Sequence, residues 1–128
     1  MSNSFSELYG GTLKEIFLKL AREQLEQGAD GLISADAYAE QGKPDFTLAY
    51  LLLMDVSDEV KRDIFARSYE QRAILSEQKA NEFSQQFHRA FPMIKVEAQK
   101  DRQAAQQIRQ GRRVRREGKT ISINFAGS

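Results

Sequence analysis

One stretch of the sequence, from Asp58 to about Phe91, constrains the fold more than any other because it predicts a single long helix. Ser57 can cap its start, and Asp58 and Glu59 stand in the first turn, where carboxylates interact favourably with the helix dipole. Pro92 cannot donate a backbone hydrogen bond and disfavours helical backbone at the residue before it, so the helix must end or kink there. We therefore expect an all-α protein with this helix at its centre.

The expected long helix carries apolar side chains on two sides. With successive residues placed about 100° apart, two stripes emerge on roughly opposite faces. A helix that packs on one side of a monomer needs only one stripe, so two stripes indicate burial between two layers. Both layers can come from one chain, or one of them can come from a second copy. One stripe contains Val60, Ile64, Ile74 and Leu75, and the other contains Phe65, Tyr69, Ala73, Ala80, Phe83, Phe87 and Phe91.

Shorter helices are expected around the long one, completing a bundle of four to five helices. Thr12 and Glu15 fit a capping box at the start of the first, and Gly28 is a natural stop at its end. Ser34 can cap the second. The third is almost entirely apolar, and its leucine and alanine content favours a buried helix over a strand. The expected ranges are 12–27, 35–41, 46–54 and 93–110.

The last residues differ in character from the rest of the chain. Residues 120–125 alternate polar and apolar side chains, a pattern that predicts a short β-strand. A lone strand cannot satisfy its own backbone groups, so it must pair with another segment, another subunit or a partner. We therefore expect a helical domain over residues 1–110 and a C-terminal arm over residues 111–128 that ends in this strand.

Charge is distributed unevenly between the body and the arm. Residues 1–108 contain 13 Lys/Arg and 17 Asp/Glu, a net charge of −4, whereas residues 109–128 contain six Lys/Arg and one acid, a net charge of +5. Arginine pairs well with phosphates and carboxylates, but no aromatic residue stands among these cations to stack on bases. Nucleic acid, an acidic protein surface and a solvated linker all remain open. The candidate residues for an anionic partner are Arg109, Arg112, Arg113, Arg115, Arg116 and Lys119.

Several chemistries are improbable on this sequence. The absence of cysteine excludes disulfides, thiolate catalysis and Cys-ligated metals. His88 is the single histidine and has no second ligand at helical spacing, and no motif marks a serine as a nucleophile. The longest apolar run, 48–54, is far shorter than the roughly 20 residues of a membrane span. We expect no enzyme activity, cofactor, metal or membrane partner, and a cytoplasmic protein.

The remaining features favour a non-catalytic helical protein-interaction protein, of adaptor or regulatory type, that forms a homodimer. Core packing is the simplest interpretation of the phenylalanine stripe, and a subunit interface is the functional one. The alternative is a nucleic-acid-binding module that acts through the basic arm, and the third is an enzyme or small-ligand binder with an unrecognised site. The candidate interface residues are Phe65, Tyr69, Phe83, Phe87, Phe91, Ile121, Ile123 and Phe125.

Overall fold

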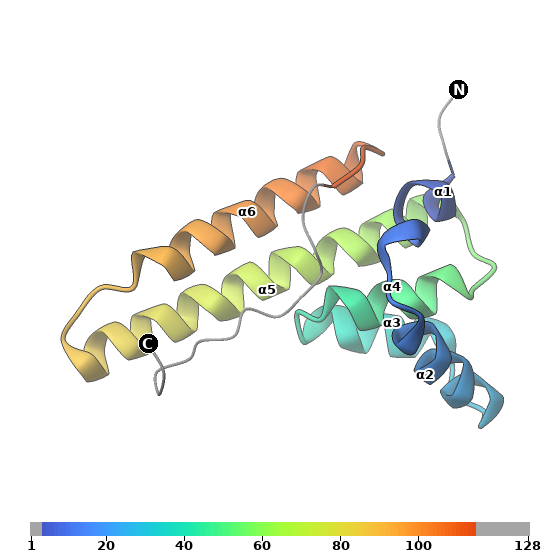
Figure 1. Cartoon of the computed structure of the whole chain (residues 1–128), viewed down its shortest axis with the longest axis horizontal. Coiled ribbons are helices and arrows are strands. Elements are labelled where there is room, and N and C mark those ends of the chain that lie inside the picture. The colour runs from blue at the N-terminus through green and yellow to red at the C-terminus, as the bar shows by residue number, and fades with distance from the viewer. Residues whose placement is uncertain (1–3, 115–128) are drawn as a thin grey trace.

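The computed structural model describes residues 4–114, and over this range the chain is entirely helical (Figure 1). The expected all-α class is therefore confirmed for these residues. The strand expected at 120–125 lies outside the described residues. The elements are α1 (Phe5–Tyr9), the single 3-10 turn η1 (Gly10–Thr12), α2 (Glu15–Glu26), α3 (Gly31–Glu40), α4 (Pro44–Leu52), α5 (Asp58–Phe87) and α6 (Pro92–Arg109).

The long helix α5 begins where the sequence predicts and ends earlier. The Ser57 hydroxyl accepts the backbone N–H of Val60 at 3.2 Å, which confirms the predicted cap. The predicted end at about Phe91 is wrong, because His88 adopts a left-handed conformation with φ 53° and ends the helix at Phe87. Pro92 then opens α6, a position where its missing N–H costs no helical hydrogen bond. α5 and α6 therefore form an antiparallel hairpin.

The start of the chain differs most from the sequence prediction. The capping box is wrong: Thr12 lies in η1, where its hydroxyl donates to the Tyr9 carbonyl at 3.3 Å, and α2 begins at Glu15 with no side-chain cap. α3 starts earlier than expected because Asp30, and not Ser34, caps it by accepting the N–H of the residue three positions on at 3.0 Å. Gly28, at φ 99°, ends α2 as predicted.

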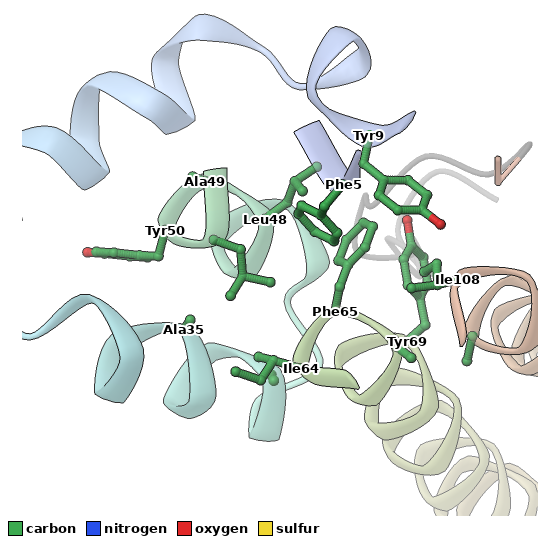
Figure 2. Packing of buried hydrophobic residues seen from close by; sticks show 14 of the residues in the cluster. Phe5, Tyr9, Ala35, Leu48, Ala49, Tyr50, Ile64, Phe65, Tyr69 and Ile108 are labelled. Atoms are coloured by element: carbon green, nitrogen blue, oxygen red, sulfur yellow. The ribbon is translucent and has the colours of Figure 1, made fainter. Parts of the chain in front are cut away.

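The lobe formed by α1 to α4 covers only the first half of α5. In Figure 1, α3 and α4 lie along one side of this half, α6 runs along the other side, and the far end of the hairpin projects beyond the lobe. Ile64 is buried on the side of α3, while Phe65 and Tyr69 face α1 and α6 (Figure 2). Both layers around this half of α5 thus come from the same chain.

An aromatic cluster closes the core at the start of α5. The ring centroid of Phe5 lies 5.0 Å from that of Tyr9 and 5.7 Å from that of Phe65, and the Phe65 ring lies 5.4 Å from that of Tyr69 (Figure 2). α1 is tied to the start of α5, because the backbone N–H of Phe5 donates to Oδ2 of Asp58 at 3.0 Å. This short helix places two large aromatic side chains over the core.

Candidate functional site

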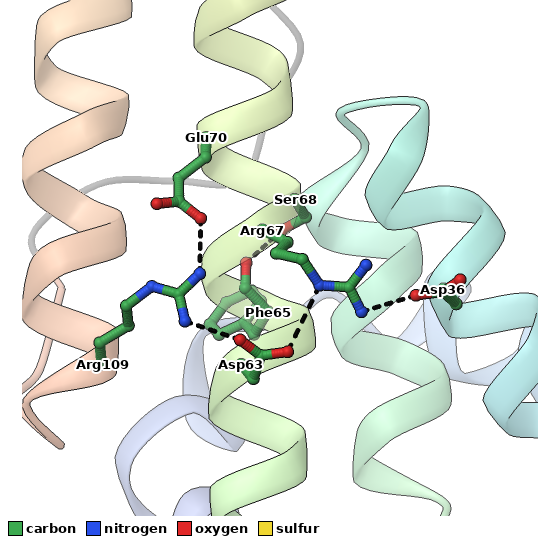
Figure 3. A network of polar contacts seen from close by, with 7 residues as sticks. All are labelled: Asp36, Asp63, Phe65, Arg67, Ser68, Glu70 and Arg109. Carbon is green, nitrogen blue, oxygen red and sulfur yellow. Dashed lines mark hydrogen bonds and ion pairs between the residues drawn. The ribbon is translucent and has the colours of Figure 1, made fainter.

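Arg109, the first cation of the basic segment, is committed to contacts within the protein. Its guanidinium, at the end of α6, donates to Oδ1 of Asp63 and to Oε1 of Glu70, both on α5 and both at 2.7 Å (Figure 3). The hydrogen bonds that Arg109 donates to these two carboxylates raise the pKa of Arg109, and the one to Asp63 is the largest of the contacts that lower the pKa of Asp63. Asp63 also lies 3.4 Å from Nε of Arg67, whose Nη2 reaches Asp36 on α3 at 2.6 Å. Arg109 thus ends a chain of ion pairs that joins three helices.

Arg112 and Arg113, the next two arginines, differ from Arg109 because their side chains point into solvent. The side chains of Arg112 and Arg113 are exposed, and no described residue forms an ion pair with either. The backbone carbonyl of Arg112 accepts the Tyr9 hydroxyl at 2.6 Å, and Val114 packs against the core. Burial raises the pKa of Tyr9 to about 12, partly offset by the nearby charge of Arg62. Residues 112–114 are therefore anchored beside α1.

The rest of the predicted arm falls outside the part of the chain that the structure describes. This applies to three of the candidate cations and to all three candidate interface residues of the expected strand. They are Arg115, Arg116, Lys119, Ile121, Ile123 and Phe125.

A second candidate site lies at the far end of the α5–α6 hairpin. The rings of Phe83, Phe87 and Phe91 contact one another there, with centroids 5.9–6.4 Å apart. Phe87, the last residue of α5, is 48% exposed. Met93, the second residue of α6, is 67% exposed. The Arg89 guanidinium lies 5.3 Å from the centre of the Phe91 ring. We call Phe83, Phe87 and Phe91 the phenylalanine cluster.

Local structure explains why the phenylalanine cluster forms. Phe83 and Phe87 are one helical turn apart and share a face of α5. The left-handed His88 turns the chain back, so Phe91 reaches both. Among the described helices, α6 is the one that runs along this part of α5, and small buried residues such as Ala80 and Ala98 leave room for the two helices to approach closely. A two-helix layer cannot enclose three large rings, so part of their surface stays in contact with solvent.

The predicted interface stripe is thus divided into two parts. Phe65 and Tyr69 are only 2% and 1% exposed, because α1 and α6 cover them. Both side chains are part of the hydrophobic core, and almost none of their surface is accessible to a partner. The phenylalanine cluster keeps exposed surface at Phe87. Met93, which the sequence interpretation omitted, is a further exposed apolar residue, in the first turn of α6. The sequence signal for Met93 was an apolar side chain directly after the helix-opening proline.

The sequence interpretation also missed a buried ion pair midway along the hairpin. Arg72 of α5 donates from Nε to Oδ2 of Asp101 at 2.9 Å and from Nη2 to Oδ1 at 2.7 Å, and both side chains are almost completely buried. The guanidinium also lies 5.2 Å from the centre of the Tyr69 ring. The signal in the sequence was Arg72 itself, a charged residue that stands between Tyr69 and Ala73 of the apolar stripe. Because the pair is bidentate and enclosed, we assign it to holding the hairpin together.

Two grooves are further candidate surfaces. One, of about 560 Å³, lies between α2, α3 and α4 and is lined mainly by apolar and aromatic side chains. In it, the Tyr38 ring stacks 4.9 Å from Phe46 and 5.8 Å from Tyr50, and Ile33 and Leu20 stand exposed beside them. We call this surface the aromatic groove.

The other groove, of about 590 Å³, lies between α3, α5 and α6, and most of the residues that line it carry polar side chains, so we call it the polar groove. Four glutamine side chains line it, together with two arginines that pair with carboxylates: Arg67 with Asp36, and Arg102 with Glu77. Within residues 4–114, no three His, Cys, Asp or Glu side chains converge to hold a metal ion. The polar groove therefore presents hydrogen-bonding groups without an evident catalytic constellation.

Comparison with known proteins finds no match to any family model, to any curated protein or to any solved structure. Among the described helices, none combines the length and the apolar character that crossing a membrane requires.

Proposed function

We propose that this protein is a non-catalytic interaction protein that forms a homodimer through the phenylalanine cluster. The observation that carries the proposal is the exposed aromatic surface at the end of a projecting hairpin, where Phe87 is 48% exposed and Met93 67%. Single exposed apolar residues are ordinary on protein surfaces, but a contiguous group of large ones marks an interaction site. Aromatic residues and methionine are also the types enriched in interfaces.

The exposed surface is large enough to matter energetically. A phenylalanine buries about 150–250 Å² when fully enclosed, so Phe87 at 48% exposure keeps about 100 Å² accessible. At about 25 cal/mol per Å², covering that surface contributes about 2.5 kcal/mol, and a symmetric dimer gains it twice. Only part of this becomes affinity, because association also costs translational and side-chain entropy.

The proposal is tested by placing a charge in the phenylalanine cluster. Phe87→Asp should weaken dimerisation at least about ten-fold, because a carboxylate at the contact would lose its hydration without gaining a partner. Gln86→Asp is the matched control, since it adds the same charge at the adjacent exposed position. Light scattering and sedimentation at micromolar concentration should give about twice 14.6 kDa for the wild type and the control. A wild-type protein that stays monomeric throughout would overturn the proposal.

A second function, binding of nucleic acid through the basic segment, is favoured by one observation. Arg112 and Arg113 are exposed and form no ion pair with a described residue, so their charges are available to phosphates. A labelled random-sequence oligonucleotide should bind at low salt and dissociate as salt rises. Replacing both arginines with glutamine should lower the slope of log affinity against log salt by about two, one for each lost phosphate contact.

The control for this second function is the pair Lys19→Gln and Arg22→Gln, which removes two exposed cations from α2 and should leave the slope unchanged. Binding that responds equally to both double variants would reflect overall charge and not the basic segment. Lack of oligonucleotide binding by the wild type at low salt would exclude the function.

A further inference from the structure

We infer that the phenylalanine cluster of one copy docks into the aromatic groove of a second copy, and that the two copies lie antiparallel so that this contact is made twice. The inference rests on the proposed homodimerisation and names the surface that receives the phenylalanine cluster. It follows from the chemistry of the two surfaces, from their charges and from their positions in the molecule.

The aromatic groove suits apolar and aromatic side chains. Its volume of about 560 Å³ lies within the range of about 300–1,000 Å³ that is typical of pockets enclosing a small molecule. Lys43 is its one charged lining residue, and the stacked rings of Tyr38 and Phe46 form part of its wall. Ile33 is 70% exposed at this groove, the largest exposure among the large apolar side chains of residues 4–114. An aromatic side chain entering there would cover Ile33 and meet the ring faces and edges that aromatic pairs prefer.

The charges around the two surfaces are complementary. Residues 15–40, which span α2 and α3, contain two Lys/Arg and six Asp/Glu, a net charge of −4. Residues 79–100, which span the hairpin end, contain four Lys/Arg and two Glu, a net charge of +2. Contact between two hairpin ends would bring like charges together, whereas contact between a hairpin end and the lobe brings opposite charges together. Complementary potentials raise association rates and exclude competing arrangements.

The positions of the two surfaces are compatible with a two-fold symmetric pair. The hairpin end and α2 lie at opposite ends of the molecule (Figure 1). In an antiparallel pair, each hairpin end therefore reaches the lobe of the other copy, and a two-fold axis relates the two contacts. Such a dimer is closed, because both surfaces of both copies are used. A single, unreciprocated contact of this kind would instead build a ring or an open chain of copies.

The test places a charge in the aromatic groove and then pairs that variant with a phenylalanine-cluster variant of opposite charge. Ile33→Lys should weaken dimerisation at least ten-fold, as Phe87→Asp does, because each places a charge in the same contact. Leu32→Lys is the matched control, since Leu32 is 40% exposed on the same helix and does not line the groove. Circular dichroism melting curves should show that all three variants keep the fold.

The decisive measurement is a mixture of Phe87→Asp and Ile33→Lys chains, one of them fluorescently labelled, followed by sedimentation. In the mixed dimer one contact is wild type and the other sets the new aspartate against the new lysine. The mixed dimer should therefore be at least ten-fold tighter than either variant alone.

Three outcomes would overturn the inference. If Phe87→Asp weakens the dimer while Ile33→Lys dimerises like the wild type, the phenylalanine cluster binds elsewhere and only the proposed homodimer stands. If both variants are weak and their mixture is no tighter, the two surfaces do not meet each other. If the wild type is monomeric, the homodimer and the inference fail together.

Discussion

Removing the carboxylate of Asp101 should destabilise the protein more than any change to its surface. Asp101→Asn keeps the shape of the side chain but removes the charge that faces the Arg72 guanidinium, whose side chain is 4% exposed. The guanidinium would then be buried without its counterion, and at least one of the two hydrogen bonds of 2.9 Å and 2.7 Å would be lost. Breaking a buried pair in this way costs about 3–5 kcal/mol.

That loss is measurable by two independent routes. In urea, the midpoint of unfolding followed by circular dichroism should fall with little change in slope. On heating, 1 kcal/mol corresponds to roughly 4 °C for a chain of this size, so the Tm should fall by about 12–20 °C. Lys100→Gln is the control: it breaks the ion pair of the exposed Lys100 side chain with Glu97 on the same helix and should cost less than about 1 kcal/mol.

A double-mutant cycle tests the reasoning further. Arg72→Met in the Asp101→Asn background removes the stranded charge and keeps a long side chain against Tyr69. The double variant should therefore be more stable than Asp101→Asn alone. A loss below about 1 kcal/mol for Asp101→Asn, or effects that simply add in the double variant, would refute the argument that the pair holds the hairpin together.

The remaining predictions concern the backbone, the buried hydroxyl and the surface ion pairs. Gly42 has a φ of 67°, and a Cβ added there would lie 2.8 Å from Cα of Arg72, so in urea unfolding Gly42→Ala should lower stability by well over the ~1–2 kcal/mol of left-handed strain. Gly28→Ala, whose added Cβ meets open space, should lower it by that strain alone. Tyr9, with its pKa raised to about 12, should ionise late in an ultraviolet titration, and the stability that it contributes should be complete below about pH 10 and lost as pH rises through 12. The pKa of Asp63 is lowered, so the stability that its carboxylate contributes is present at neutral pH and lost in acid, and Asp63→Asn should flatten the acid limb of the stability curve.

Local chemistry explains the features that were predictable from sequence. The start of α5 follows from the Ser57 hydroxyl, which caps a backbone N–H only three residues away. The end of α2 at Gly28 is likewise local, because glycine permits the positive φ that stops a helix wherever it occurs. The all-α class and the helical periodicity of the phenylalanine stripe depend on the same short-range rules.

The features that escaped prediction depend on contacts between distant residues. α1 is a helix of five residues, too short to show a period, and packing of Phe5 and Tyr9 on Phe65 accounts for its place in the fold. The partner of Arg72 lies 29 positions along the chain, so sequence spacing alone could not identify it.

The division of the candidate site was likewise decided by tertiary structure. The sequence placed Phe65 and Phe87 on one stripe as equivalents, and it placed Arg109 and Arg112 in one basic segment. Their roles differ because α1 covers Phe65 while no described element encloses Phe87, and because α5 carries two carboxylates opposite Arg109. Periodicity and composition determine which side chains share a face. Burial and pairing depend on which other helix reaches that face, and only the packed structure determines that.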